Sequence, residues 1–356
     1  IISCSFIMGN DKLILGSDYM IYPTFIKKGD TIGVPAPSNG IIREVKVNQL
    51  NMAIKKFEEK GYSILETDHV RTNENYASCD AKVRAQELES LYKNQDVQAI
   101  ICATGGEFLL EMLSYFDFSV VKNHIKWLQD YSDPTGLLFT ITTNYDIATI
   151  YGHNFVGFGM DPWHESMENN LKILESNLVF QKSFSMYEGE WVEPVLGTEE
   201  YTLNTPVCWK NLNDEEKIEI KGRMIGGCID IITELFGTRF DKTKEFIEKY
   251  KEDGIIWYFD NCELSSEDLV RTLWKFKDNG WFQYSHGVIF GRSACHESNF
   301  GITFGDAVRR VLGELNIPII IDADFGHVPP RMTIINGAYA TIVNKDGKGT
   351  IKFELK

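Results

Sequence analysis

The sequence predicts an α/β protein in two parts: a parallel sheet covered by helices, then a mixed sheet that ends in antiparallel strands. Short apolar runs alternate with amphipathic segments from residue 31 onward, which is typical of βαβ units. The same alternation resumes near residue 222, after a polar and aromatic stretch. Residues 337–355 alternate apolar and polar side chains around Asp346-Gly347, which is a hairpin signal. The 356 residues provide enough chain for about two domains.

In the first part, three apolar runs are expected to form buried strands, at 31–38, 62–67 and 97–103. Amphipathic segments at 44–60 and 81–94 separate these strands, and Gly61 ends the first segment as a helix stop. A further helix is expected at 107–116, directly after a Gly-Gly turn. Each helix returns the chain to start a parallel strand, so both faces of the sheet are covered.

In the second part, the expected strands are 254–259, 286–292 and 317–323, with helices at 265–280 and 304–315 between them. The intervening stretch contains Pro194 and Pro206 and shows no long helical period. The expected organisation is an extension (1–19), an N-terminal domain (20–175), a crossover (176–215) and a C-terminal domain (216–356). The first eight residues are apolar but lack a charged region before them and a cleavage site after them, so we expect no signal peptide there.

Composition excludes several classes of protein. The 36 basic and 51 acidic side chains give a formal charge of -15, which argues against nucleic acid or an anionic membrane as partner. No apolar run reaches the roughly 18–20 residues of a membrane-spanning helix. The seven cysteines are scattered, without a CxxC pair, as in the reduced thiols of a cytoplasmic protein.

Three junctions where a strand enters a loop carry candidate chemistry, because ligands bind at the carboxyl ends of parallel strands. Gly105-Gly106 would bring backbone N–H groups to an oxyanion or carboxylate, or would only let strand and helix pack closely. His327 lies beside Gly and Pro-Pro and could be a general base, or could hydrogen-bond locally. Asp260 ends an apolar strand and could orient that histidine, or could simply precede the next helix.

Other residues point to function more weakly. GGEFLLE is neither a dinucleotide fingerprint nor a P-loop, and the histidines lack HxxxH or HExxH spacing, so we expect no cofactor and no metal. Cys262 and Cys295 show no sign of thiol activation. Trp191 and Trp209 lie in the crossover, where they would contact a ligand or belong to the core.

Taken in order, the motifs resemble the family of LD-carboxypeptidases and microcin C immunity proteins, which are serine peptidases. The resemblance runs from about Ile26 to the C-terminus and rests on these motifs: KKGDTIGVPAPSNG, ICATGGEFLLEMLSYFDF, QDYSDPTGLLFTI, KGRMIGGCIDIITELFGT, IIWYFDNCE, HGVIFGR and PIIIDADFGHVPPRMTIINGA. It implies a Rossmann-like N-terminal domain, a C-terminal domain with a barrel-like sheet, and a Ser-Glu-His triad between them. It also implies a homodimer, without metal or cofactor.

Carried over residue by residue, the triad is incomplete. His327 matches the family histidine, and Asp260 stands where the family has Glu. The position read as the nucleophile, third after Gly-Gly, is Leu109, which cannot form an acyl-enzyme. Ser132 is expected on a supporting loop, and Glu107 and Asp260 could activate water with His327. The residues expected to frame the oxyanion pocket are Gly105, Gly106 and Leu110.

Two functions follow from the resemblance. The first is a weakened or altered peptidase acting on L,D-linked muropeptides in cell-wall recycling, or on peptidyl- or aminoacyl-nucleotides of the microcin C type. The second is a non-catalytic homologue that sequesters or senses the same class of small ligand. Leu109 and Asp260 favour the second, whereas His327 and the overall resemblance favour the first.

Overall fold

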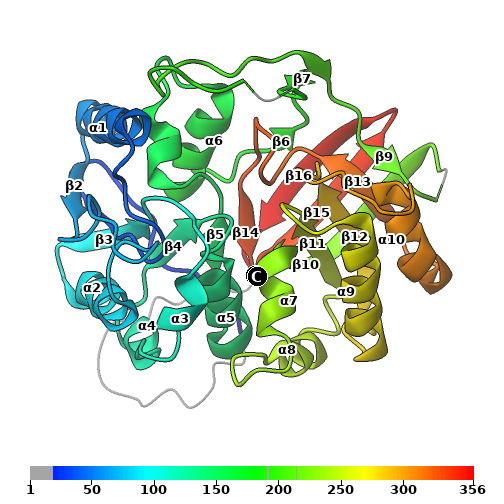
Figure 1. Ribbon diagram of the computed structural model, residues 1–356. Coiled ribbons are helices and arrows are strands. Elements are labelled where there is room, and N and C mark those ends of the chain that lie inside the picture. The colour runs from blue at the N-terminus through cyan, green and yellow to red at the C-terminus, as the bar shows by residue number, and fades with distance from the viewer. Residues whose placement is uncertain (1–18, 191, 214) are drawn as a thin grey trace, which may run out of the picture.

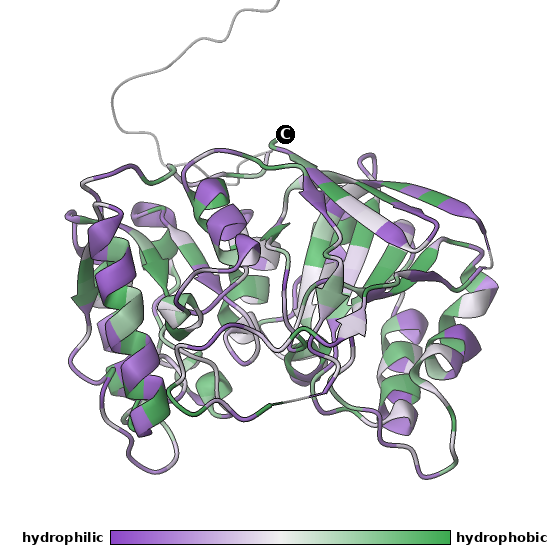
Figure 2. Cartoon of the chain, turned by 90° about the horizontal axis from the view of Figure 1, so that it is seen from above, coloured by the Kyte–Doolittle hydropathy of each residue, from purple (hydrophilic) through white to green (hydrophobic). Residues whose placement is uncertain are grey.

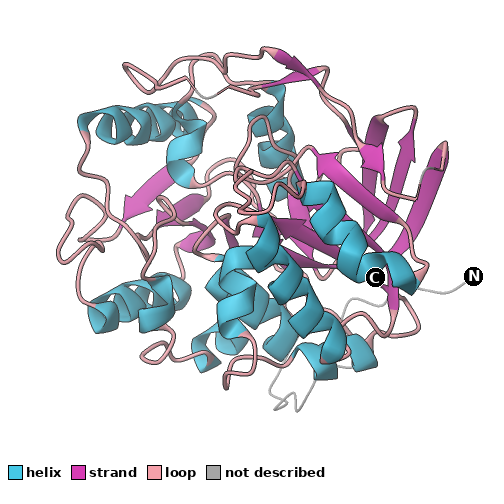
Figure 3. Ribbon diagram, turned by 45° about the vertical axis from the view of Figure 1, so that its right-hand side comes forward, coloured by secondary structure: helices cyan, strands magenta, loops and turns pink. Residues whose placement is uncertain are grey.

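The structure is a computed structural model that describes residues 19–190, 192–213 and 215–356 (Figure 1). The expectations for the extension before Tyr19 and for Trp191 therefore lie outside the described residues. In the described part of the chain, no helix is both long and apolar enough to cross a membrane. Two sheets stand side by side, each with its own helices (Figures 1 and 3).

The first sheet has six strands in the order β14-β5-β4-β3-β1-β2. Its first five strands in chain order pair in parallel, as expected from the alternation of apolar runs and helices. Side chains on β3, β4 and β5 are almost all buried, because helices cover both faces. The strands are β1 (Thr31–Val34), β2 (Ser63–Glu66), β3 (Val97–Ile101), β4 (Trp127–Asp130), β5 (Thr149–Tyr151) and β14 (Ile334–Asn336).

The helices of this first part lie above and below its sheet in Figure 1, with α1 and α6 on one side and α2 to α5 on the other. The helix expected at 107–116 is shorter: α3 spans four residues, and Phe108 before it offers no side-chain cap. The helices are α1 (Glu44–Glu59), α2 (Ala81–Lys93), α3 (Leu109–Met112), α4 (Ser119–Asn123), α5 (Thr135–Tyr145), η1 (Phe155–Gly159) and α6 (Glu165–Leu174).

The second sheet has eight strands in the order β6-β16-β15-β10-β11-β12-β13-β9. Four central strands are parallel, and β15 and β16 form the antiparallel hairpin that the sequence predicts. Two short strands from the expected crossover pair at the edges of this sheet. The strands are β6 (Gln181–Lys182), β9 (Lys210–Asn211), β10 (Lys217–Cys228), β11 (Ile255–Asp260), β12 (Ser285–Gly291), β13 (Ile319–Ala323), β15 (Tyr339–Lys345) and β16 (Lys348–Glu354).

Helices α7, α9 and α10 lie together beside this sheet, with α8 near α5 (Figure 1). Hydrophobic residues are concentrated on the strands and on the helix faces turned toward them (Figure 2). The remaining elements are β7 (Met186–Tyr187), β8 (Thr205–Pro206), α7 (Ile229–Leu235), α8 (Thr243–Lys249), α9 (Ser266–Asp278), α10 (Phe304–Leu312) and η2 (Gly313–Leu315).

The two sheets are joined through the loop that follows β13. That loop leaves the second sheet at Ala323, carries His327, and enters the first sheet as β14, which pairs antiparallel with β5. The histidine is therefore held between the sheets by a strand of each. This crossing was not predicted, because a three-residue strand is too short to show a sequence period.

Candidate active site

Ser132 lies in the tight turn between β4 and α5. Its φ of +70° is in the left-handed region, which is unfavourable for a residue with a Cβ atom. The Ser132 carbonyl accepts a hydrogen bond from the Thr135 N–H at 2.9 Å, so the turn leads directly into the helix. A strained serine between a strand and a helix is the geometry of a nucleophile elbow, which exposes the hydroxyl at the end of the sheet.

His327 connects this hydroxyl to a buried carboxylate. Its Nε2 lies 2.9 Å from the Ser132 Oγ, and its Nδ1 lies 2.7 Å from the Asp260 Oδ2. The His327 backbone N–H also donates to the Asp260 Oδ1 at 3.2 Å, which fixes both ring and backbone. Gly326 has a φ of +95°, and a Cβ there would lie 2.1 Å from the Asp260 Oδ1. Only glycine at that position allows the loop to approach the carboxylate so closely.

Asp260 ends β11 and is fully buried. Burial alone would raise the pKa of this carboxyl. The charge and hydrogen bonds of His327 outweigh burial and hold the pKa below its ordinary value. A 2.6 Å hydrogen bond from the Tyr151 hydroxyl acts in the same direction. Burial would in turn lower the pKa of His327, but the Asp260 charge outweighs it and raises that pKa well above its ordinary value. When the ring is neutral, its proton on Nδ1 is directed to Asp260, and Nε2 is left to accept from Ser132.

The Gly105-Gly106 turn lies against Ser132. A Cβ at Gly105 would lie 3.0 Å from the Ser132 Cβ and 3.1 Å from its Oγ. The Asp133 carboxylate links the turn after β4 to the segment after Gly105-Gly106 by hydrogen bonds. Its Oδ2 accepts from the Leu109 N–H at 3.0 Å and from the Ser38 hydroxyl. Within the described chain, the N–H groups of Gly105 and Asp133 have no protein acceptor. They are therefore available to an oxyanion beside Ser132.

The structure corrects the assignment of the nucleophile position. Leu109 begins α3 and is fully buried, and its side chain packs toward α5, where a Cβ at Gly136 would lie 2.9 Å from it. The expectation that Leu109 faces the imidazole is therefore wrong, because its side chain belongs to the core between α3 and α5. The hydroxyl within hydrogen-bonding distance of His327 is that of Ser132, which was expected only to support the site.

Three other residues predicted to belong to the site were placed by the structure as follows. Leu110 packs beside Leu109 toward Gly136. Most of the Glu107 side chain is exposed to solvent. Its carboxyl still loses part of its hydration to the residues around it, and this loss, with the charges of nearby carboxylates, raises its pKa. The prediction that Trp209 contacts a ligand is wrong: its side chain is 1% exposed, and its Nε1–H donates to the Asp324 Oδ2 at 2.8 Å.

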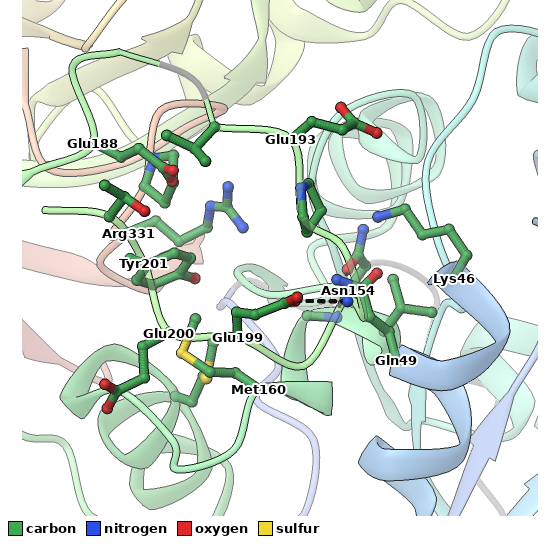
Figure 4. A pocket seen from close by; sticks show the side chains of 18 of the residues that line it. Lys46, Gln49, Asn154, Met160, Glu188, Glu193, Glu199, Glu200, Tyr201 and Arg331 are labelled. Atoms are coloured by element: carbon green, nitrogen blue, oxygen red, sulfur yellow. Dashed lines mark hydrogen bonds between the residues drawn. The ribbon is translucent and has the colours of Figure 1, made fainter. Parts of the chain in front are cut away.

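A pocket of about 320 Å³ opens beside His327 and Tyr131. Lys46 of α1 and Arg331 point into it from opposite sides (Figure 4). Arg331 is buried, donates through Nε to the Gly326 carbonyl at 2.8 Å and lies 4.3 Å from the centre of the Tyr131 ring. Burial lowers the pKa of Lys46, whose Nζ has no ion-pair or hydrogen-bond partner among the described residues. The pocket therefore contains two cationic side chains, in a lining that also includes Glu188, Glu193, Glu199 and Glu200.

Four residues near the triad were not predicted from the sequence: Tyr131, Tyr151, Lys46 and Arg331. The serine could have been found from its context, because Tyr131-Ser132-Asp133 follows an apolar strand and precedes the helix that begins at Thr135. Arg331 follows His327 in the same loop. For Lys46 and Tyr151, the sequence carries no local signal.

Comparison with known proteins agrees with this arrangement of two sheets. Residues 32–152 match the model of the LD-carboxypeptidase N-terminal domain, and residues 221–342 match that of the C-terminal domain. The microcin C7 self-immunity protein MccF of Escherichia coli is 24% identical over 321 residues, which cover 88% of this chain and 90% of that protein. The probable murein peptide carboxypeptidase of Bacillus subtilis is 26% identical over 324 residues, which cover 90% and 91%.

Solved structures show the same fold. An MccF-like protein from Bacillus anthracis superposes with a TM-score of 0.78 at 23% identity, covering 94% of this chain and 100% of that chain. MccF in complex with aspartyl sulfamoyl adenosine superposes with a TM-score of 0.77 at 23% identity, covering 94% and 98%. The predicted α/β fold class and the predicted resemblance are both confirmed. On the match of both domain models, this chain belongs to the LD-carboxypeptidase family.

Proposed function

We propose that this protein is a serine hydrolase that cleaves an amide or related acyl bond. Ser132 is the nucleophile, His327 the general base and then acid, and Asp260 the residue that orients and stabilises the imidazole. The observation that supports this proposal most directly is a pair of short contacts. The Ser132 Oγ lies 2.9 Å from His327 Nε2, and His327 Nδ1 lies 2.7 Å from the Asp260 Oδ2. This is the arrangement by which a neutral hydroxyl becomes a nucleophile.

The reaction proceeds in two halves. The Ser132 Oγ attacks the substrate carbonyl carbon while its proton passes to His327 Nε2, and the negative charge of Asp260 stabilises the imidazolium. The N–H groups of Gly105 and Asp133 stabilise the oxyanion that forms. His327 then protonates the leaving nitrogen as the C–N bond breaks. In the second half, a water oxygen attacks the acyl carbon while the water proton passes to Nε2. His327 then returns this proton to the Ser132 Oγ as the ester C–O bond breaks, which releases the carboxylic acid.

The pocket supports a substrate that carries an anionic group near the scissile bond. Lys46 and Arg331 supply positive charge there. Four glutamates also line the pocket, and the carboxylate of one of them, Glu199, is occupied by N–H groups of residues 195–197. We therefore propose L,D-linked muropeptides or acyl-nucleotides as substrates, both of which carry carboxylate or phosphate groups. The relatives support this, since one is named a murein peptide carboxypeptidase and MccF has been solved with aspartyl sulfamoyl adenosine.

The binding-only alternative is not favoured. It was based on Leu109 at the expected nucleophile position and on Asp260 in place of Glu. Ser132 supplies a hydroxyl beside the imidazole, and Asp260 contacts the ring with its shorter side chain. Within the proposal, the reaction takes place in the cytoplasm as part of cell-wall recycling or toxin immunity. The enzyme acts there as a homodimer, with catalytic domains at 20–175 and 216–356 and the 176–215 crossover between them.

Turnover tests the proposal directly. The purified protein is incubated with a tetrapeptide ending in an L,D bond and, separately, with aspartyl sulfamoyl adenosine, and products are followed by mass spectrometry. We expect hydrolysis of at least one substrate, abolished in His327→Ala. Binding of both compounds by calorimetry without any product would support the sequestering role and overturn the hydrolase.

A further inference from the structure

Two thiols lie beside the triad and take no part in the proposed reaction. Cys228 ends β10, next to Asp260 in the parallel register of β10 and β11. The Cys228 Sγ, one Asp260 carboxylate oxygen and one His327 ring nitrogen all lie within 4.8 Å of one another. Cys228 is 2% exposed and Asp260 is fully buried, so these donor atoms meet in a site largely closed to water.

Cys262 approaches the same ring from the loop after β11. Its thiol adds to the rise in the pKa of His327 that Asp260 mainly causes, and its backbone N–H donates to the Asp230 Oδ2 at 3.0 Å. The same carboxylate oxygen accepts from the Cys228 Sγ at 3.2 Å. Both cysteines are therefore held near the imidazole by one acidic side chain. Each is a half-buried or buried free thiol.

The donor set has the chemistry of a soft divalent cation. Thiolate, imidazole and carboxylate are the ligands that Zn²⁺ takes in proteins, and thiolate selects against Mg²⁺ and Ca²⁺. With metal–ligand bonds of about 2.0–2.3 Å, the donors of such a site lie about 3.5 Å apart. An ion that replaces the proton between His327 Nδ1 and Asp260 Oδ2, which are 2.7 Å apart, moves these two atoms apart by about 0.8 Å. The Cys228 Sγ lies within 4.8 Å of both and comes nearer by at most about 1.3 Å. The carboxylates of Asp230 and Asp260 provide negative charge around the ion.

We propose that Cys228, Asp260 and His327 form an inhibitory site for Zn²⁺ or a similar thiophilic cation, with the Cys262 thiol as a further donor. Cys228 loses its proton to solvent as the metal–sulfur bond forms. The metal occupies Nδ1, so the remaining imidazole proton resides on Nε2. A protonated Nε2 cannot accept the proton of Ser132, and hydrolysis stops. The inhibition rests on the proposed function, whereas the metal binding does not.

Spacing rules could not reveal this site, because its ligands come from the ends of three separate strands and loops. Cys228 and Asp260 meet through strand pairing, and His327 joins them across the two sheets. The absence of HxxxH or HExxH spacing therefore excludes only zinc sites built on one helix.

The experiment measures binding and inhibition separately on the full chain. Co²⁺ is titrated as a spectroscopic probe, and we expect the thiolate charge-transfer absorption of a Co–S bond. Zn²⁺ should displace Co²⁺ and should inhibit hydrolysis over the same concentration range. Ser132→Ala, which removes hydrolysis, should keep the absorption band, so failure of the proposed function would not hide the metal site.

Variants identify the ligands. Loss of a residue that only supports a ligand costs about 10–100-fold in metal affinity, so Cys228→Ser should weaken Zn²⁺ binding at least 100-fold. Cys262→Ser should cost about tenfold. Cys208→Ser is the matched control, because that cysteine is exposed and lies away from the triad, and it should bind Zn²⁺ as the unchanged protein does. No thiolate band, or inhibition that Cys228→Ser leaves unchanged, overturns the proposal.

Discussion

Two neighbouring turns of the first sheet perform different tasks at the same edge. The strands β3 and β4 are adjacent and parallel, and both lead into a helix. After β3, Gly105-Gly106 leads into a helix of four residues without a side-chain cap. After β4, one strained serine leads into the eleven-residue helix α5. The first turn presents backbone N–H groups, and the second presents a side chain.

The difference follows from what supports each turn. Residues 135–143 of α5 are all buried, and the helix packs against α7, α8 and β10 of the second part. This rigid helix holds Ser132 in an unfavourable backbone conformation. The Gly105 turn lies close to Ser132, and a side chain there would collide with it. In the proposed reaction, the strained serine of one turn and the lack of side chains in the other together leave space for a tetrahedral intermediate.

The largest effect on kcat is expected when the serine hydroxyl is removed from the second turn and a serine is placed after the first. Ser132→Ala should lower kcat by about 10⁶-fold, the usual cost of losing a triad serine. Leu109→Ser, added to Ser132→Ala, should restore nothing, because position 109 is buried against α5. The measurement is single-turnover hydrolysis, with folding checked by circular dichroism. Recovery of activity in the double variant would show that position 109, after the Gly-Gly turn, can present the nucleophile.

The next largest effect on activity is expected from Asp260, the carboxylate that orients the His327 ring toward Ser132. Asp260→Asn should lower kcat by about 10⁴-fold, because the imidazole loses its orientation. The Asp260 charge raises the pKa of His327, and the reaction needs the neutral ring, so the unchanged enzyme should gain activity as pH rises past a midpoint above about 6.5. In Asp260→Asn that acid limb should move to lower pH.

The measurement is kcat/KM against pH for both proteins, with product followed by mass spectrometry. A limb that stays in place after Asp260→Asn would mean that another group controls the titration, and the assigned role of Asp260 would fail.

Much of the fold is predictable from the sequence, and the physical reason is the periodicity of apolar residues. Buried parallel strands such as Val97–Ile101 and Ile255–Asp260 are apolar runs bounded by helices, so their existence and order are readable. The hairpin around Asp346-Gly347 is readable because turn chemistry is local. The pairing of Ile334–Asn336 with the first sheet is not readable, because three residues carry no period.

The site was readable in part. His327 and Asp260 were found because each stands at a strand end with polar chemistry. Ser132, the proposed nucleophile, was not predicted as such because counting from Gly-Gly identified a helix residue, whereas the strained backbone of Ser132 depends on how α5 packs. Trp209 was misjudged since a tryptophan among polar residues in sequence can still be buried by a second sheet.

A smaller effect should follow from adding a methyl group to the first turn. In Gly105→Ala the new Cβ would press on the Ser132 Cβ and Oγ at 3.0 and 3.1 Å and displace the N–H that faces the oxyanion. Loss of one oxyanion donor costs about 10²–10³-fold in kcat, and we expect the lower end with KM little changed. Gly313→Ala is the control, since its Cβ would meet only Arg309 at 3.5 Å. Equal kinetics in both variants would remove the Gly105 turn from the oxyanion site.

The smallest effect on activity is expected from Lys46, which brings a positive charge into the pocket beside the turn that holds Ser132. Lys46→Met removes an ammonium whose pKa burial lowers and which has no partner within the described chain. We expect kcat/KM to fall about tenfold, or about 1.4 kcal/mol, for a substrate with a free carboxylate and to stay unchanged for its amide. Because Met relieves an unpaired charge, Tm should stay level or rise. Lys55→Met, on the exposed side of α1, is the control, and equal losses on both substrates would show that Lys46 shapes the pocket without binding an anion.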